Sequence, residues 1–326
     1  MKTLNHFKSP IKFLLTDIDD TLTDDGLLGP EAYSALWELH SHGIKVIPVT
    51  GRPAGWCELI ARQWPVDGVI GENGAFYFRY SDKKMNRHFA KIEMPLQKTN
   101  EEYSQYSLSP SSINKENLSL SKKPPQFPSS APLNKPSLEK QFSNSLEKTE
   151  LKTDDPSQEK LLKSDVQFHL TKIKNEILKE VPGAAVASDQ FCRLYDLAID
   201  FCEDVPPLNP SEVDKIVKIF KNHGAQAKVS SIHVNGWFGK HNKVFMAKEF
   251  LSKEFNLSID EMKVQCAFSG DSPNDEPMFE FFPHSFAVAN FENFKNQVEH
   301  LPAYISNSRG GKGFAEICKQ ILHSQN

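Results

Sequence analysis

Short runs of apolar residues alternate with amphipathic stretches over the first part of the chain. The runs cover residues 11–15, 44–49 and 66–70, and polar or turn-forming residues bound each of them. Runs of this length are typical of buried strands, and stretches with a period near 3.6 residues are typical of helices. The pattern therefore predicts parallel strands that are joined by helices.

The stretch between the first two runs has the spacing of a helix. Four side chains recur at intervals of three and four residues and are expected on one helix face: Tyr33, Leu36, Trp37 and His40. Pro30 suits the first helical turn, where its missing N–H has no helical partner, and Gly43 suits the end. A second helix is predicted over residues 54–64.

The composition changes over residues 96–159, which are rich in Ser, Lys, Glu, Asn and Pro and contain no Gly. Prolines within this segment remove backbone donors: Pro110, Pro124, Pro125, Pro128, Pro132, Pro136 and Pro156. No sustained apolar period crosses it. We therefore expect a disordered insertion.

Regular structure returns after this segment in the order helix, strand, strand, helix, strand, strand. The predicted ranges are 161–181, 184–188, 193–201, 211–222 and a strand pair within 226–237. Ser211 is the expected N-cap of the second helix. Two such units can cover one sheet face with two helices, which predicts a small α+β domain.

The α/β rhythm then resumes to the end of the chain. The predicted elements are a helix over 243–255, a strand over 264–269, a helix over 276–282, a strand over 285–288 and a helix over 314–322. Residues 310–313 (Gly-Gly-Lys-Gly) lack the spacing of a P-loop and are expected to form a turn.

The predicted fold class is thus a Rossmann-like α/β core with a parallel sheet, interrupted by an inserted α+β cap domain. We assign residues 1–80 and 238–326 to the core, and residues 81–95 and 160–237 to the cap.

Charge and composition exclude several classes of protein. The 326 residues include 38 basic and 42 acidic side chains, a net charge of -4 that does not favour nucleic acid as a partner. No run of 18 apolar residues and no signal-peptide core occurs, so we expect no membrane segment and a cytoplasmic protein. Five widely spaced cysteines favour neither a disulfide framework nor a zinc site.

Carboxylates gather directly after two of the predicted strands. They are Asp17, Asp19 and Asp20 after residues 11–15, and Asp271 and Asp275 after residues 264–269. Ligands of parallel sheets bind at the carboxyl ends of strands. Each pair of carboxylates at a distance of ~4 Å would repel by about 4 kcal/mol at an effective dielectric constant of ~20. The alternatives are a solvated acidic turn or a hard cation with oxygen ligands such as Mg²⁺.

Two further features suit a phosphate group. Thr50-Gly51-Arg52 follows the strand at 44–49 and offers a hydroxyl and backbone N–H groups. Lys243 opens a predicted helix, where its ammonium could balance carboxylate and phosphate charge, and Lys240 is a nearby competitor.

Taken together, these motifs resemble those of haloacid dehalogenase superfamily phosphatases, in the branch whose α/β cap follows the third strand. The motifs occur in the same order: Asp17-Ile18-Asp19-Asp20-Thr21, Thr50-Gly51-Arg52, Lys243, and Gly270-Asp271 with Asn274-Asp275. Glu72-Asn73-Gly74-Ala75 and the order of the cap elements also resemble this branch. One departure is Asp20, where the family more often has glycine.

The resemblance implies that Asp17 is a nucleophile that forms an aspartyl-phosphate and that Asp19 is the general acid and base. It also implies Mg²⁺ held by the side chains of Asp17 and Asp271 and the main-chain carbonyl of Asp19, with Asp275 close by. Phosphate would contact residues of the other motifs: Thr50, Gly51, Arg52, Lys243 and Asn274.

In this branch the cap selects the substrate, a small phosphorylated molecule. The expected contacts are Arg193, His233 and Asn235 of the cap, together with Asn73. The expected reaction is Mg²⁺-dependent hydrolysis of a sugar phosphate or a related metabolite. A phosphosugar mutase of the phosphomannomutase type and a non-catalytic sugar-phosphate sensor remain alternatives.

Overall fold

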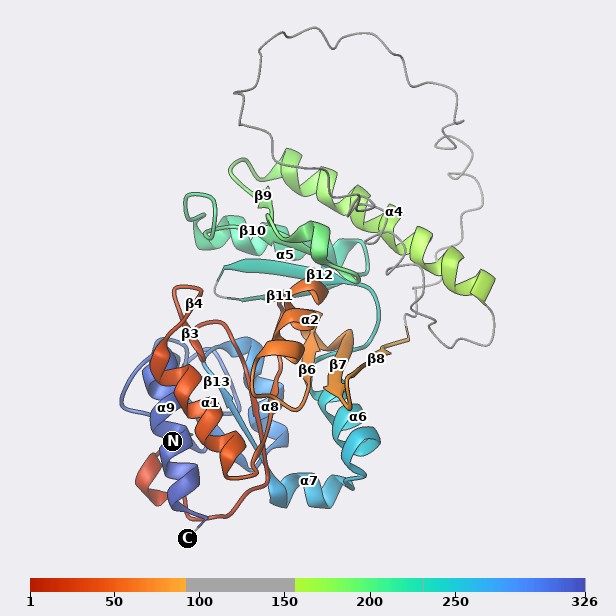
Figure 1. The fold of residues 1–326 in the computed structure, drawn as a ribbon. Coiled ribbons are helices and arrows are strands. Elements are labelled where there is room, and N and C mark those ends of the chain that lie inside the picture. Colours follow the sequence, from red (N-terminus) through yellow and green to blue (C-terminus); the bar gives the residue numbers. More distant parts are fainter. Residues whose placement is uncertain (92–155, 231, 326) are drawn as a thin grey trace, which may run out of the picture. The chain divides into compact units, whose positions relative to one another are not determined.

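The computed structural model describes residues 1–91, 156–230 and 232–325 (Figure 1). The predicted disordered insertion lies outside the described residues, except for its last four positions. There the prediction is wrong, because helix α4 (Pro156–Glu180) already begins at Pro156. Proline is well tolerated in the first turn of a helix, where its N–H would have no partner.

A six-stranded parallel sheet forms the centre of the core, in the order β1-β15-β14-β13-β2-β5. Its strands are β1 (Lys2–Thr3), β2 (Phe13–Thr16), β5 (Lys45–Pro48), β13 (Cys266–Gly270), β14 (His284–Ala287) and β15 (Tyr304–Ile305). The adjacent strands β2 and β13 are far apart in the sequence, yet Leu14 pairs with Ala267. The predicted fold class, a parallel α/β core that is interrupted and later resumed, is confirmed.

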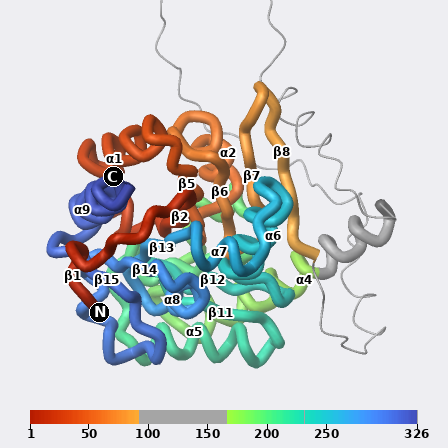
Figure 2. The backbone as a smooth tube through the Cα atoms, turned by 90° about the horizontal axis from the view of Figure 1, so that it is seen from below, coloured from red at the N-terminus to blue at the C-terminus, as the bar shows by residue number. Residues whose placement is uncertain are grey.

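Helices cover both faces of this sheet (Figure 2). On one face, Leu14, Val46 and Ala267 pack in a common cluster with α1 (Pro30–Ser41), α2 (Ala54–Gln63) and α9 (Gly310–His323). On the other face, alternate strand residues such as Leu15 and Phe268 pack against α6, α7 and α8. These helices span Lys243–Phe255, Ile259–Gln265 and Glu276–Phe281. Because successive strand side chains point to opposite faces, strands covered on both sides are apolar throughout.

The predicted residues share one side of α1, but the buried face of the helix is centred on other residues. The buried residues are Ala32, Ala35, Leu36 and Leu39, whereas Trp37 is 50% exposed. Tyr33 packs partly against the core, and the Trp37 ring contacts the rings of Tyr33 and His40 edge to face. The spacing was helical, but small alanines and not Trp37 fit against the sheet.

Two helix boundaries and one additional helix also correct the sequence analysis. The glycine-rich residues 310–313 are the first turn of α9 and not a turn before it. The N-cap of α5 (Pro210–Asn222) is Asn209, whose side chain accepts from the backbone N–H of Glu212 in a capping box. Helix α7 was not predicted, although Ser258 and Glu261 form the same type of box at its start.

A smaller antiparallel sheet extends the edge of the core. It consists of β6 (Val69–Gly71), β7 (Phe76–Ser81) and β8 (Lys84–Phe89). A single bridge between Val49 and Ile70 joins it to the strand β5. The sequence analysis grouped residues 81–95 with the cap, but β8 pairs along its whole length with β7, so the boundary that we propose lies after Phe89.

The cap has the predicted order of elements, α4, β9 (Ala185–Val186), β10 (Asp196–Asp200), α5, β11 (Gln226–Val229) and β12 (His233–Trp237). Its antiparallel sheet runs β11-β12-β10-β9. Ile173 of α4 and Phe220 of α5 pack with Leu197 and Val234 of the sheet in a core of their own. The opposite face of the sheet is therefore left for the site.

Short elements complete the described chain: η1 (Leu4–His6), β3 (Thr23–Asp24), β4 (Leu27–Leu28), η2 (Glu72–Gly74), η4 (Gln190–Cys192), η5 (Pro273–Asp275) and η6 (Ala289–Asn293). Among the described residues, no helix has the length and apolar character needed to cross a membrane.

Candidate active site

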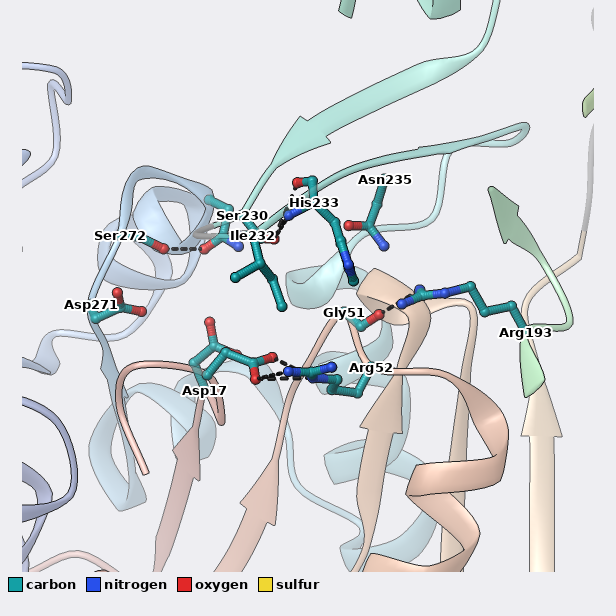
Figure 3. A pocket seen from close by; sticks show the side chains of 12 residues that line it. Asp17, Gly51, Arg52, Arg193, Ser230, Ile232, His233, Asn235, Asp271 and Ser272 are labelled. Atoms are coloured by element: carbon teal, nitrogen blue, oxygen red, sulfur yellow. Dashed lines mark hydrogen bonds and ion pairs between the residues drawn. The ribbon is translucent and has the colours of Figure 1, made fainter. Parts of the chain in front are cut away.

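The carboxyl ends of the neighbouring strands β2 and β13 bring the predicted aspartates together. Asp17 directly follows β2, and its backbone N–H donates to the carbonyl of Ser269 on β13. Asp271 directly follows β13. Both side chains lie on the floor of a pocket, with residues of the cap opposite (Figure 3).

Lys243 lies between two of these carboxylates. Its Nζ atom donates to Asp17 Oδ2 and to Asp275 Oδ1, both at 2.8 Å, and only 5% of the residue is exposed. Burial works against the charged ammonium, but Asp17 and Asp275 raise the pKa of Lys243 above its ordinary value. The competitor Lys240 is exposed.

The loop after β13 is shaped by Asp275. Its Oδ2 atom accepts from the backbone N–H groups of Asp271 at 3.1 Å and Ser272 at 3.4 Å. A side chain at Gly270 would collide with the Asp275 carboxylate. Glycine at this position therefore allows the strand end and the loop to close on each other.

One oxygen from each of Asp17, Asp271 and Asp275 lies within 4.8 Å of the others, and all three residues are buried. Burial, followed by Asp275, raises the pKa of Asp17 to about 8, and the same two causes raise that of Asp271. One ammonium faces three carboxylates, so the ionised cluster carries an excess of negative charge. A cation with oxygen ligands fits this donor set.

Asn290, which the sequence analysis missed, positions this cluster through hydrogen bonds. The Nδ2 atom of Asn290 donates to the carbonyl of Asp20 at 2.7 Å and to Asp271 Oδ2 at 3.4 Å. Its Oδ1 atom accepts from the N–H of Gly310 in the first turn of α9. Thr21 donates to the other oxygen of Asp271. Asp20 has a φ of 56°, the left-handed region that favours glycine.

Asp19 is paired with Arg52. The Nε atom of Arg52 donates to Asp19 Oδ1 at 2.9 Å, and its Nη1 atom donates to Glu203 Oε1 of the cap at 3.2 Å. His233 Nε2 lies 2.9 Å from the other oxygen of Glu203. We call this chain of Asp19, Arg52, Glu203 and His233 the Arg52 bridge. The sequence analysis grouped Arg52 with the phosphate contacts, whereas its guanidinium here joins two carboxylates.

The cap supplies the roof of the pocket. His233 and Asn235 point down from β12, and Ser230 and Ile232 precede that strand (Figure 3). The cavity between roof and floor has a volume of about 20 Å³. A space of this size holds about one water molecule, so the roof is closed down on the floor.

The sequence also matches a family of known proteins. Residues 14–194 match the model of the haloacid dehalogenase-like hydrolases. The chain belongs to this family. No curated protein sequence matches it.

Solved structures share the fold of this haloacid dehalogenase-like hydrolase. Protein 0175 of Thermoplasma acidophilum is 17% identical with a TM-score of 0.57, over 96% of this chain and 99% of that one. The sucrose-phosphatase of Synechocystis, solved with sucrose and phosphate, is 15% identical with a TM-score of 0.53, over 97% and 98%. The sugar phosphatase BT4131 is 13% identical with a TM-score of 0.53, over 95% and 99%.

Arg193 joins the cap to the core in this hydrolase. Its guanidinium donates to Asp189 at 2.9 Å, to Asp196 at 3.0 Å and to the carbonyl of Gly51 at 2.9 Å. Asn235 donates to the same Asp196 carboxylate at 2.9 Å. Arg193 therefore lines the pocket with a guanidinium that these partners already hold.

Glu72 makes a second connection that sequence reasoning did not assign. Its fully buried carboxylate accepts from the backbone N–H of Ala54 at the start of α2, and of Leu194 and Tyr195 in the cap. Burial, followed by Asp196, raises the pKa of Glu72 to about 8. The family-like run at 72–75 thus marks a junction between core and cap.

The remaining predicted residues lie around this pocket. Thr50 is fully buried and its Oγ1 atom accepts from the N–H of Arg52, while Asn73 packs its amide beside Gly51. Asn274 lines the pocket and accepts from the hydroxyl of Ser272. Glu203 lies in the turn after β10 and Asn290 lies in η6, and both were missed because neither belongs to a motif in the sequence.

Proposed function

We propose that this protein is a Mg²⁺-dependent phosphomonoester hydrolase that acts through an aspartyl-phosphate on Asp17. The observation that carries the proposal is the position of Lys243, whose ammonium contacts Asp17 and Asp275 at 2.8 Å. A buried cation beside a buried carboxylate at a strand end suits the binding of a phosphoryl group next to its nucleophile.

In the first step, an Asp17 oxygen attacks phosphorus and the ester P–O bond breaks. Ile18 N–H donates to Asp17 Oδ1 at 2.8 Å and Lys243 holds Oδ2, so the carboxylate is fixed in orientation before substrate arrives. Such positioning, together with neutralisation of charge, supplies most of the catalysis in phosphoryl transfer.

Asp19 completes both steps as a proton carrier. It gives a proton to the departing oxygen of the alcohol and then takes a proton from the water that attacks the aspartyl-phosphate. Water attack breaks the bond between phosphorus and Asp17 and releases phosphate. The location of Asp19 two residues after Asp17, on the pocket wall, supports this role.

The side chains of Asp17 and Asp271 and the carbonyl of Asp19 would hold Mg²⁺. Asp275 is better suited to positioning, because Lys243 and two backbone N–H groups already engage its oxygens. When bound, the ion would neutralise the carboxylates and draw charge from the phosphoryl oxygens. The Thr50 hydroxyl, the backbone at Gly51, Lys243 and Asn274 would contact the phosphate.

The substrate that we propose is a sugar phosphate or a similar small polar metabolite. The polar roof residues His233, Asn235 and Ser230 support this, since such groups can hydrogen-bond to hydroxyls. The names of two structural neighbours, a sucrose-phosphatase and a sugar phosphatase, also support a carbohydrate substrate.

A panel of sugar phosphates, assayed with purified protein for released phosphate, tests this proposal. We expect turnover of at least one member with Mg²⁺ and loss of turnover after chelation with EDTA. Analysis of the organic product from a single sugar phosphate separates a hydrolase from a mutase, which would return phosphate to the sugar. Binding of a sugar phosphate without turnover would favour a sensor.

A further inference from the structure

We infer that Glu203 of the cap is a positioning residue for the acid and base Asp19, and that it acts through Arg52. This inference rests on the proposed function, because it assigns a role within the same reaction. The geometry behind it is the Arg52 bridge, which runs from the wall of the core pocket into the cap.

Arg52 has little freedom apart from this bridge. Its side chain is 4% exposed, and the guanidinium stacks 4.4 Å from the centre of the Trp56 ring. The Nε and Nη2 atoms face Asp19, and both Nη1 and Nη2 donate to Glu203 Oε1, at 3.2 and 3.3 Å. Nη1 also lies 3.9 Å from Asp189. A planar guanidinium that is held on both edges transmits the position of one carboxylate to the other.

Glu203 is itself held in place by the cap. Asp200, the last residue of β10, accepts from the backbone N–H groups of Cys202, Glu203 and Asp204 at 2.8–2.9 Å, which fixes the turn that follows the strand. His233 and then Arg52 lower the pKa of Glu203 to about 2, so this residue is a carboxylate at physiological pH. The Glu203 side chain is 28% exposed and contacts the pocket residues Arg52 and His233.

The bridge therefore exists only while the cap is closed. Opening of the cap would remove Glu203 and His233 from Arg52, which would keep Asp19 and the Trp56 ring as its partners in the core. Closure therefore adds the support of Glu203 to a pair of Arg52 and Asp19 that the core already supplies. Closure would thus exclude water and restrict the orientation of the proton-transfer group at the same time.

The dependence of rate on the leaving group tests this role. The value of kcat/KM reports the steps through departure of the leaving group, and p-nitrophenolate leaves without a proton whereas an alkoxide needs one. In Glu203→Ala we expect kcat/KM to fall about 10²-fold for a sugar phosphate and far less for p-nitrophenyl phosphate. Asp204→Asn removes a charge from the next residue and should change neither value.

Two further variants separate positioning from simple loss of structure. Glu203→Gln keeps one acceptor oxygen and should lose less than Glu203→Ala. In an Arg52→Gln background, Glu203→Ala should cause little further loss of kcat/KM, because the guanidinium through which Glu203 acts is already absent. Equal losses on both substrates, or additive losses in the double variant, would overturn the inference.

Hydrogen exchange measured by mass spectrometry needs no turnover and tests the bridge by itself. We expect faster exchange over residues 50–57 in Glu203→Ala than in Asp204→Asn, since Arg52 would lose its support from the cap. Unchanged exchange in this region would overturn the inference even in an active enzyme. If the wild-type protein hydrolyses no phosphate, the proposed function fails, and exchange alone decides on the bridge.

Discussion

The floor of the pocket and its roof are constructed differently. The floor consists of residues that follow the core strands β2, β5 and β13, and Lys243 at the start of α6 contacts Asp17 of this floor. The roof consists of His233 and Asn235 of the cap strand β12 together with Ser230 and Ile232 just before it, and Glu203 in the turn after β10 contacts His233. The floor is fixed by strand ends that meet whatever the substrate is, whereas the roof depends on the closure of the cap. In the function that we propose, the floor carries the chemistry and the roof selects the substrate, with Glu203 acting across the boundary through Arg52.

Among changes to the floor, removal of the nucleophile should have the largest effect on activity. In Asp17→Asn we expect kcat to fall by roughly 10³-fold or more, because an amide does not replace the attacking carboxylate oxygen. The measurement is phosphate release from the best substrate of the panel. Asp25→Asn makes the same change at an exposed position of the neighbouring loop and should keep full activity. Activity of Asp17→Asn near the wild-type value would exclude the covalent route.

The next largest effect on activity is expected when the ammonium of Lys243 is removed. Lys243→Met should lower kcat/KM by about 10²–10³-fold, in the range seen when one preorganised donor is removed from a transition state. Loss of the ammonium also leaves Asp17 and Asp275 without their buried partner, so the unfolding transition must be measured in parallel. Lys240→Met is the matched control on the same loop. A larger loss in this control would move the role to Lys240.

Loss of Asn290, which positions a proposed metal ligand, should have a smaller effect. Asn290→Ala removes the amide that donates to Asp271 Oδ2 and to the carbonyl of Asp20. We expect Mg²⁺ affinity, measured by calorimetry, to fall about 10–100-fold, the usual range for a residue that orients a metal ligand. Asn293→Ala changes an exposed residue on the same short helix η6 and should leave the affinity unchanged. Equal Mg²⁺ affinities in the two variants would show that Asn290 does not position the metal ligands.

The contrast between floor and roof also explains what the sequence could predict. Asp17 and Asp271 were placed together because the ends of parallel strands share one edge of a sheet, and that is a property of the fold. No comparable rule predicts the position of Glu203. It lies in a polar turn of the cap, and only the contact between cap and core brings it to Arg52. A contact between two separately folded layers leaves no periodic signal along the chain.

The prediction of helices and strands from the sequence has the same limit as the prediction of site residues. The parallel sheet and the order of the cap elements followed from apolar runs, but the buried face of α1 did not, because Ala32 and Ala35 fit the sheet where Trp37 does not. Likewise, the glycines at 310–313 looked like a turn, yet Asp24 and Asn290 accept from the backbone N–H groups of Gly311 and Gly310 in a helix. Shape complementarity and distant acceptors decided both cases.

The smallest effect is expected where the roof rejoins the floor, at His241 between β12 and α6. Both ring nitrogens are buried without a hydrogen-bond partner among the residues that the structure describes, and the ring stacks on Trp237. His241→Phe would keep the stacking and remove the unpaired polar atoms. We expect it to raise the free energy of unfolding by about 1–3 kcal/mol at neutral pH, measured by urea denaturation. His323→Phe on the last turn of α9 is a matched control that should bring no such gain.

The gain from His241→Phe should also depend on pH. Burial lowers the pKa of His241 from its ordinary 6.5 to about 4. Between these values the unfolded chain binds a proton that the folded protein does not, so the wild-type protein loses stability as the pH falls from 6.5 toward 4. The loss reaches about 3.5 kcal/mol at most, since one pKa unit corresponds to about 1.4 kcal/mol. The phenylalanine variant should lack this component, and the stability difference between the two proteins should widen over that range. A constant difference from pH 7 to pH 4.5 would show that the ring is solvated or paired, and that the junction between roof and floor opens to water.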